Sequence, residues 1–266
     1  MKAGVYTTPK KDGTLLFRAS ITVKDKHISL GSFPDEETAH KAYLAAGRIL
    51  SGKKTLERFT EEYRDNKKFI LPFEKTVMLC NLRDNGVYIK TPVYLEKKSF
   101  LYYYSPEIRY RFDADDLFYY SNHKIMKRGS HLFVADYGMQ VNILSRYGIR
   151  SHAVAGRDYV FANGDETDFR YDNIKVINHY YGVTRENRNG RDVYIAKIHI
   201  NGDVIIGKYA TENEAAVAYN KAVYLLKENG CRTAYPENYL EDVSELQYVA
   251  LFNRVRLSEN IRKYSV

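Results

Sequence analysis

The sequence predicts an α+β fold in which two small modules, each a three-stranded antiparallel sheet with one helix, flank a middle domain. The first observation behind this prediction is an internal repeat near the two ends of the chain, in which the spacing from Gly31 to Tyr43 equals that from Gly207 to Tyr219. The second is an alternation of apolar and polar residues in each copy, which is typical of strands. The third is a following stretch with alanines at helical spacing.

In the first copy, residues 17–24 alternate between apolar and polar side chains, which indicates a strand with one buried face. Residues 24–26 (Lys-Asp-Lys) predict a hairpin turn into a second strand at residues 28–33. Asp35 is expected to cap the N-terminus of a helix. Along that helix Ala39, Ala42 and Ala46 recur on one side, so their small side chains let the helix lie close to the sheet.

The second copy repeats this order with stronger signals. Residues 194–200 alternate as a strand does, and Asn201-Gly202-Asp203 is a strong hairpin turn because Asn and Gly tolerate a positive φ. Thr211 followed by Glu214 predicts a capping box at the start of a helix. Alanines again recur at helical spacing through residue 222. Each copy is therefore expected to form three antiparallel strands backed by one helix.

Several short motifs make this unit resemble the ethylene-response-factor type of DNA-binding domain, known from plants and from bacterial and phage proteins. They are the initial Gly-Val, the strand Tyr-Ile-Ala-Lys-Ile from Tyr194, the turn Gly-Lys-Tyr from Gly207, and the helix at residues 214–222. The resemblance implies that the open face of each sheet lies in the major groove of DNA and presents polar side chains to base edges. Where the family usually has tryptophans, this chain has Phe17, Tyr194, Ser29 and Ile205, so the family's base preference is not transferred.

The resemblance carries candidate DNA-binding residues onto both copies. In the first copy they are Tyr6, Thr8, Lys10, Arg18, Ser20, Thr22, Lys24 and Ser29. In the second copy they are Thr184, Arg185, Glu186, Arg188, Arg191, Lys197, His199 and Ile205.

The middle of the chain, residues 108–179, resembles an HNH endonuclease domain of the ββα-metal type. The shared frame is Asn163-Gly164-Asp165, then Asp168, Arg170 and Asn173-Ile174-Lys175. The resemblance implies a His general base just before the Asn-Gly-Asp turn and an Asn between Asp168 and Arg170. This sequence has Phe161 and Phe169 there, and Val160 where an acidic ligand is expected. Phenylalanine neither accepts a proton nor binds a cation, so we expect a degenerate nuclease domain with no catalytic residue and no metal.

Other residues could in principle rescue catalysis. His152 lies outside the frame and is read as a surface or turn residue, and His123 and His131 flank a basic hairpin. The cluster Asp113, Asp115 and Asp116 suits a helix N-terminus better than a metal site. No cofactor motif is present, so we expect no cofactor and no small-molecule substrate.

The remaining segments complete the predicted domain organisation. Residues 1–58 form the first module, 59–107 a connecting strand-rich segment with runs at 87–89 and 99–104, and 180–231 the second module. The tail at residues 232–266 is either a helix packed on the core or a phosphate contact. Cys80 and Cys231 fit no metal or redox spacing and are read as free thiols, with a disulfide between them as the alternative.

Charge and composition agree with a polyanion as the partner. The chain has 41 Lys and Arg against 33 Asp and Glu, a net charge of +8. Residues 1–60 hold 11 basic and 6 acidic residues (+5), whereas residues 180–231 hold 7 and 6 (+1). The first module is therefore expected to supply more of the electrostatic affinity. The sequence shows neither a signal peptide nor a membrane span, which predicts a cytoplasmic protein, associated with the nucleoid if it is bacterial or from a phage.

Taken together, the sequence predicts a non-catalytic, sequence-specific protein that binds double-stranded DNA and regulates transcription or a mobile element. Two alternatives stay open. One is an active homing-type HNH endonuclease with a relocated catalytic residue. The other is a protein-binding inhibitor or adaptor on a nuclease-like scaffold, so a protein partner stays open as well.

Overall fold

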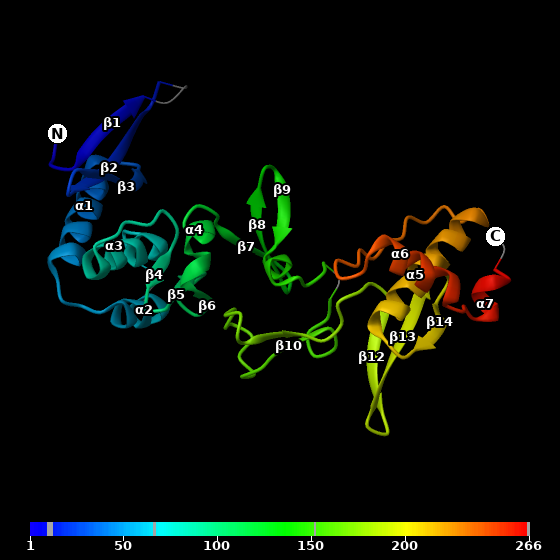
Figure 1. Ribbon diagram of the computed structural model, residues 1–266. Coiled ribbons are helices and arrows are strands. Elements are labelled where there is room, and N and C mark those ends of the chain that lie inside the picture. Colours follow the sequence, from blue (N-terminus) through cyan, green and yellow to red (C-terminus); the bar gives the residue numbers. More distant parts are fainter. Residues whose placement is uncertain (10–12, 66–67, 152, 265–266) are drawn as a thin grey trace. The chain divides into compact units, whose positions relative to one another are not determined.

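The computed structural model describes residues 1–9, 13–65, 68–151 and 153–264 (Figure 1). The chain divides into two compact units: unit 1 comprises Met1–Ile143 and Asn163–Asn173, and unit 2 comprises Leu144–Ala162 and Ile174–Val266. Helices and five small antiparallel sheets make up the described part, which confirms the α+β prediction. No helix in that part is long and apolar enough to cross a membrane.

The N-terminal module forms the predicted sheet and helix. Strands β1 (Val5–Pro9), β2 (Leu15–Val23) and β3 (Lys26–Phe33) pair in that order, and helix α1 (Glu36–Ser51) follows. Lys24 and Asp25 both adopt a positive φ in the turn between β2 and β3. Asp35 caps α1 by accepting a hydrogen bond from the backbone N–H of Thr38 at 2.7 Å. The three alanines of α1 are fully buried in the same core cluster as the inner sheet residues, as expected.

The second module repeats this arrangement in unit 2. Strands β12 (Val183–Arg188), β13 (Arg191–His199) and β14 (Asp203–Tyr209) precede helix α5 (Glu212–Glu228), which begins with the predicted capping box of Thr211 and Glu214. Figure 1 shows β12 and β13 extending past β14 as a two-stranded ribbon.

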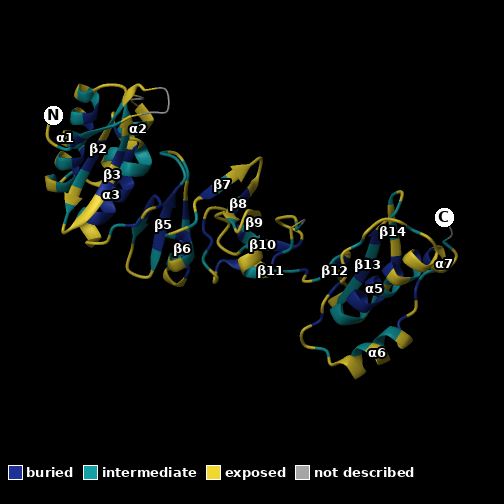
Figure 2. Cartoon of the chain, turned by 90° about the horizontal axis from the view of Figure 1, so that it is seen from above, coloured by how far each residue is buried: buried dark blue, intermediate teal, exposed yellow. Residues whose placement is uncertain are grey.

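The C-terminal tail packs on this module. Helices α6 (Glu245–Arg254) and α7 (Glu259–Arg262) follow, and Leu240, Val255, Leu257 and Ile261 are buried in the core of the module. Of the two alternatives for the tail, packing on the core is therefore what the structure adopts, and the outward side of α6 is exposed (yellow in Figure 2).

The repeat holds in the details of the backbone. A bulge shifts the register after Ala19 in one sheet and after Ala196 in the other. The carbonyl of Gly4 accepts a hydrogen bond from the N–H of Ser20 at 2.9 Å, and that of Gly182 accepts the equivalent bond from Lys197 at 2.7 Å. Conserving a bulge and its flanking hydrogen bond requires matching local geometry, so the two copies share one backbone design.

Gly182 is required where β12 begins, and this makes a testable prediction. Its φ is +66°, and a Cβ there would lie 2.4 Å from the ring of Tyr219 and 2.3 Å from the carbonyl oxygen of Lys197. Gly182→Ala should lower the free energy of unfolding by about 2–4 kcal/mol, from left-handed strain and overpacking together. Gly190 is the matched control, because its φ is +78° and no atom lies within 4 Å of its Cβ position. Chemical unfolding of both variants decides the point, and equal losses would contradict the close packing.

Residues 59–107 differ from the prediction of a strand-rich connection. Helices α2 (Leu56–Asp65) and α3 (Phe73–Asn85) occupy much of this segment, and no strand forms at residues 87–89. Neither helix was predicted from the sequence. In α3, residues 76–82 are all buried. A helix buried on every side lacks the one-sided apolar period by which a helix is recognised.

The predicted boundary at residue 107 runs through a sheet. Strand β4 (Val93–Leu95) pairs with β5 (Ser99–Tyr103), and β5 pairs with β6 (Arg109–Asp113), which lies beyond the boundary. Tyr102 and Tyr103 on β5 are buried, at 1% and 2% exposure, so they are core residues. Both cysteines are free thiols, as predicted.

The rest of the middle segment consists of short elements. A 3-10 turn (Ala114–Asp116) and helix α4 (Leu117–Tyr120) lead to a sheet of β7 (Ile125–Arg128), β8 (His131–Asp136) and β9 (Met139–Asn142), followed by a 3-10 turn at Ile143–Tyr147. Strand β10 (Tyr159–Phe161) then pairs with β11 (Ile174–Val176). Residues 177–182 lead into β12 without a helix. The structure therefore has an antiparallel pair, β10 and β11, but no helix between β11 and β12 that would complete a ββα unit.

Candidate nucleic-acid interface

The sheet of the N-terminal module has one face turned away from α1, which we call outer face 1. Residues directly opposite each other in an antiparallel pair share a face, so the strand register defines its members. They are Tyr6, Thr8, Leu16, Arg18, Ser20, Thr22, His27, Ser29 and Ser32. Six of the eight candidate residues of the first copy lie on this face. Lys24 lies in the turn beside it, and Lys10 lies outside the described residues.

Outer face 1 is polar and basic. None of the residues that define it is acidic, and Arg18, which is exposed, forms no ion pair with any other residue that the structure describes. Ser20 was expected to be exposed as a DNA-binding candidate, but only 9% of its surface is exposed. The rings of Tyr6 and His27 come from the two outer strands and lie 6.4 Å apart, centroid to centroid, next to the central strand. They shield the small Ser20 side chain between them, so Tyr6 and His27 are better placed than Ser20 to contact a ligand.

The corresponding surface of the second module, outer face 2, is turned away from α5. Its members are Thr184, Glu186, Arg188, Arg191, Val193, Ile195, Lys197, His199, Asp203, Ile205 and Lys208. Seven of the eight candidate residues of the second copy lie on it. Arg185 does not, because it lies opposite Tyr194 on the other face and pairs with Asp192 at 2.5 Å.

Outer face 2 is more balanced in charge than outer face 1. Glu186 pairs with Arg188 at 2.7 Å, and His199 pairs with Asp203 at 3.0 Å. The hydrogen bond from Arg188 lowers the pKa of the Glu186 carboxyl, so this acid stays ionised on the face. Lys197 forms no ion pair with another described residue. At its centre Ile195 is only 2% exposed, whereas Ile205 is 47% exposed.

Sequence reasoning missed four polar members of these faces: His27, Ser32, Asp203 and Lys208. Simple alternation from Ser29 and Ile205 would turn Ser32 and Lys208 inward. The bulge places an extra residue, Leu30 in one sheet and Ile206 in the other, on the inner side, and this reverses the alternation beyond it. His27 could have been found from the sequence, since it alternates with the buried Ile28.

The nuclease-like frame is built into the core of unit 1. Phe169 is 4% exposed, and its ring stacks on Phe112 at 5.4 Å and meets Tyr110 edge-on at 5.7 Å. Its backbone N–H donates to the carbonyl of Arg111 at 2.7 Å, which attaches the loop at residues 163–173 to β6. The position of the catalytic Asn in the resemblance is therefore filled by a packing residue.

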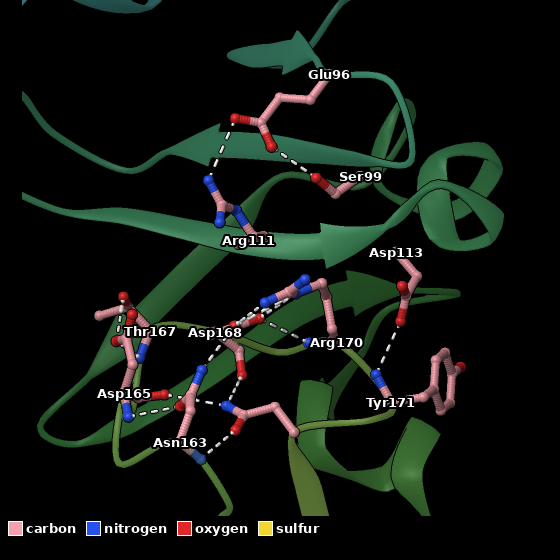
Figure 3. A network of polar contacts seen from close by, with 11 residues as sticks. Glu96, Ser99, Arg111, Asp113, Asn163, Asp165, Thr167, Asp168, Arg170 and Tyr171 are labelled. Carbon is pink, nitrogen blue, oxygen red and sulfur yellow. Dashed lines mark hydrogen bonds and ion pairs between the residues drawn. The ribbon is translucent and has the colours of Figure 1, made fainter.

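Asp168 is the centre of the polar network of this loop (Figure 3). Its carboxylate is 5% exposed and accepts hydrogen bonds from the guanidinium of Arg170 at 2.6 Å and from the amide of Asn163 at 3.0 Å. The amide of Asn173 donates to its backbone carbonyl at 2.8 Å. These polar residues of the frame are thus hydrogen-bonded to one another, and their hydrogen bonds fix the conformation of the loop.

The network makes the stability of the protein depend on pH. Burial by itself would raise the pKa of Asp168, but the hydrogen bonds from Arg170 outweigh it and hold the pKa below its usual value. A carboxyl with a depressed pKa stabilises the fold above its unfolded pKa of about 3.9, and this stabilisation is lost as the pH falls through the folded pKa. Asp168→Asn should therefore be less stable than the wild type at pH 7, and the difference should shrink below about pH 4. Thermal unfolding across pH checks this, with the exposed Asp172→Asn as control; a constant difference would contradict it.

The other polar candidates of the middle segment are engaged locally. His123 stacks on Tyr119 and contacts Asp136 at 3.4 Å, and Asp113 accepts a hydrogen bond from the N–H of Tyr171 at 2.8 Å. His131 is exposed at the start of β8, and His152 lies outside the described residues. Within those residues, no group of three His, Cys, Asp or Glu side chains is arranged to hold a metal ion.

Comparisons with models of protein families, with curated proteins and with solved structures give no match to this chain.

Proposed function

We propose that this protein binds double-stranded DNA through outer faces 1 and 2, without cleaving it, as a regulator of transcription or of a mobile element. The observation that supports this most is the duplicated module with an open sheet face. A two- or three-stranded ribbon fits the major groove, and polar side chains on it can reach base edges. Two such modules on one chain increase overall affinity by ~10²–10⁴-fold when both contact the same DNA molecule.

The charge distribution supports a polyanion as the ligand. Among the residues that the structure describes, Arg18 on outer face 1 and Lys197 on outer face 2 have no carboxylate partner, so each can neutralise a phosphate or donate to a base. On outer face 2, Arg188 and His199 are each paired with an acid of the same face. The N-terminal module is therefore proposed to contribute more of the salt-dependent affinity, in agreement with its charge of +5 over residues 1–60.

The absence of nuclease chemistry is part of the proposal. It is supported by the packing role of Phe169 and by the mutual pairing of Asp168 and Arg170. Phe161 occupies the position that the resemblance assigns to the general base, so a general base would have to be supplied by another residue of the chain.

The deciding experiment measures binding of the whole protein to a random duplex library over a salt series, followed by sequencing of the bound fraction. We expect affinity that falls steeply with salt and an enriched sequence with two half-sites. A plasmid-nicking assay with magnesium, manganese or zinc runs in parallel, and metal-dependent cleavage would overturn the non-catalytic assignment. Lack of salt-sensitive DNA binding, together with a stable protein partner on pull-down, would favour the adaptor instead.

A further inference from the structure

A pocket of about 390 Å³ lies in unit 2 beside the open edge of β13. Strand β12 pairs with β13 only as far as Ala196, so residues 197–199 have no strand on that side. The pocket is lined there by Arg150, Ala153, Arg157 and Asp158, with Tyr181, Tyr219 and Tyr235 among its walls. The hydroxyl of Tyr235 donates to the carbonyl of His199 at 2.9 Å, which holds this wall against the strand edge.

Arg150 is a partly buried cation in the wall of this pocket. Its guanidinium lies 4.6 Å from the centroid of the Tyr181 ring and donates one hydrogen bond, to the carbonyl of Asn178 at 3.2 Å. No carboxylate pairs with it in the part of the chain that the structure describes, and burial lowers its pKa. A guanidinium has five N–H donors in a planar fork that matches a phosphate, so most of the donors of Arg150 are available to a ligand.

The other charges of the pocket favour an anion as well. Arg157 and Lys197 add two cations. Asp158 opposes them but is 8% exposed, and its oxygens accept hydrogen bonds from the N–H of Val154, from Arg157 and from Asn178. Asp203 contacts the ring of His199 at 3.0 Å. Asp158 and Arg157 therefore pair with each other, whereas Arg150 and Lys197 have no carboxylate partner among the residues that the structure describes.

We propose that this pocket holds a phosphate group and that, on the proposed function, this is a phosphodiester of the DNA bound by the second module. Thr184, Lys197 and His199 belong both to outer face 2 and to the pocket wall, so DNA lying on that face brings its backbone to the pocket. Residues 150–158, which precede the module by more than twenty positions, become part of the interface. Such a contact fixes the position of the protein on the duplex and does not read sequence.

The test compares Arg150→Gln, which keeps a donor for the Asn178 carbonyl, with Arg150→Lys, which keeps the charge. Affinity for duplex DNA is measured by fluorescence anisotropy over a salt series, and folding by thermal unfolding. We expect Arg150→Gln to bind roughly 10-fold more weakly and to lower the salt slope by about 1, with partial recovery in Arg150→Lys. Arg157→Gln, whose parent side chain is 57% exposed, is the second variant in case Arg150→Gln is unstable. Lys227→Met, on the outward side of α5, is the control for loss of one charge.

The outcomes separate this inference from the proposed function. If the wild type binds DNA while both Gln variants keep its affinity and salt slope, the inference is overturned and the proposed function stands. If the wild type does not bind DNA, titration with inorganic phosphate by calorimetry decides: binding that Arg150→Gln abolishes supports a phosphate site of another source, and no binding overturns both.

Discussion

Replacing Arg18 and Lys197 by methionine should weaken the binding of duplex DNA by about 1–3 kcal/mol for each residue, or roughly 5- to 150-fold. Methionine keeps the length and apolar volume of the side chain and removes its charge, so the loss reports on the interaction with DNA. Because Arg18 lies in unit 1 and Lys197 in unit 2, the two losses should add in the double variant. A mobility-shift assay at fixed salt measures all three.

The chain offers matched controls on the opposite sides of the two modules. Arg48 and Lys227 are exposed near the C-terminal ends of α1 and α5, the helices that cover the inner sheet faces. Arg48→Met and Lys227→Met remove the same charges and should leave the affinity nearly unchanged. Equal losses in all four single variants would show a response to net charge alone, and unchanged binding in Arg18→Met and Lys197→Met, with the fold intact, would refute the assignment of the sheet faces.

Replacing Phe169 by alanine should lower the free energy of unfolding by about 3–5 kcal/mol. The ring is 4% exposed and lies between aromatic residues of β6, so its removal leaves a cavity that rigid aromatic neighbours cannot fill. Chemical denaturation, followed by tyrosine fluorescence, measures the loss. Phe118→Ala is the control, because Phe118 is 86% exposed in the same unit and should cost less than about 0.5 kcal/mol.

Phe169→Asn extends this test to the nuclease resemblance. It restores the residue type that the motif expects, but it places an amide among Phe112 and Tyr110. We expect it to destabilise the protein at least as much as Phe169→Ala, because a buried amide without partners costs additional free energy. A stable Phe169→Asn variant that nicks plasmid DNA would refute the view that this position serves packing.

The sequence predicted the elements whose signals are local. The turn at Lys24 and Asp25, the cap at Asp35 and the capping box of Thr211 all formed where expected, because each depends on a few neighbouring residues. The inner positions of β2 and β13 followed from alternation. Where burial is complete, as in α3, the periodic signal disappears, and the helix was not predicted from the sequence.

The candidate faces show the same division between neighbouring strands. In the central strands β2 and β13, alternation places Arg18 and Lys197 correctly on the outer side. In the edge strands β3 and β14, the bulge turns Ser32 and Lys208 outward against the simple pattern. A bulge depends on how two strands pair, and pairing is not a property of one strand. The contribution of Arg150 depends on an even longer-range contact, since its segment meets the edge of β13 only in the folded unit.

By itself, then, the sequence determined that the chain contains one sheet-and-helix module twice, that the first copy is the more basic, and that the residues expected for nuclease chemistry are replaced by Phe161 and Phe169. Only the tertiary structure decided that Phe169 is a core residue. It also placed Arg185 on the opposite sheet face from the other candidate residues of the second copy, and it showed that Ser20, beside the rings of Tyr6 and His27, is largely buried. The physical reason is that side-chain exposure follows from strand register and from packing between distant segments, whereas charge, turns and caps are encoded locally.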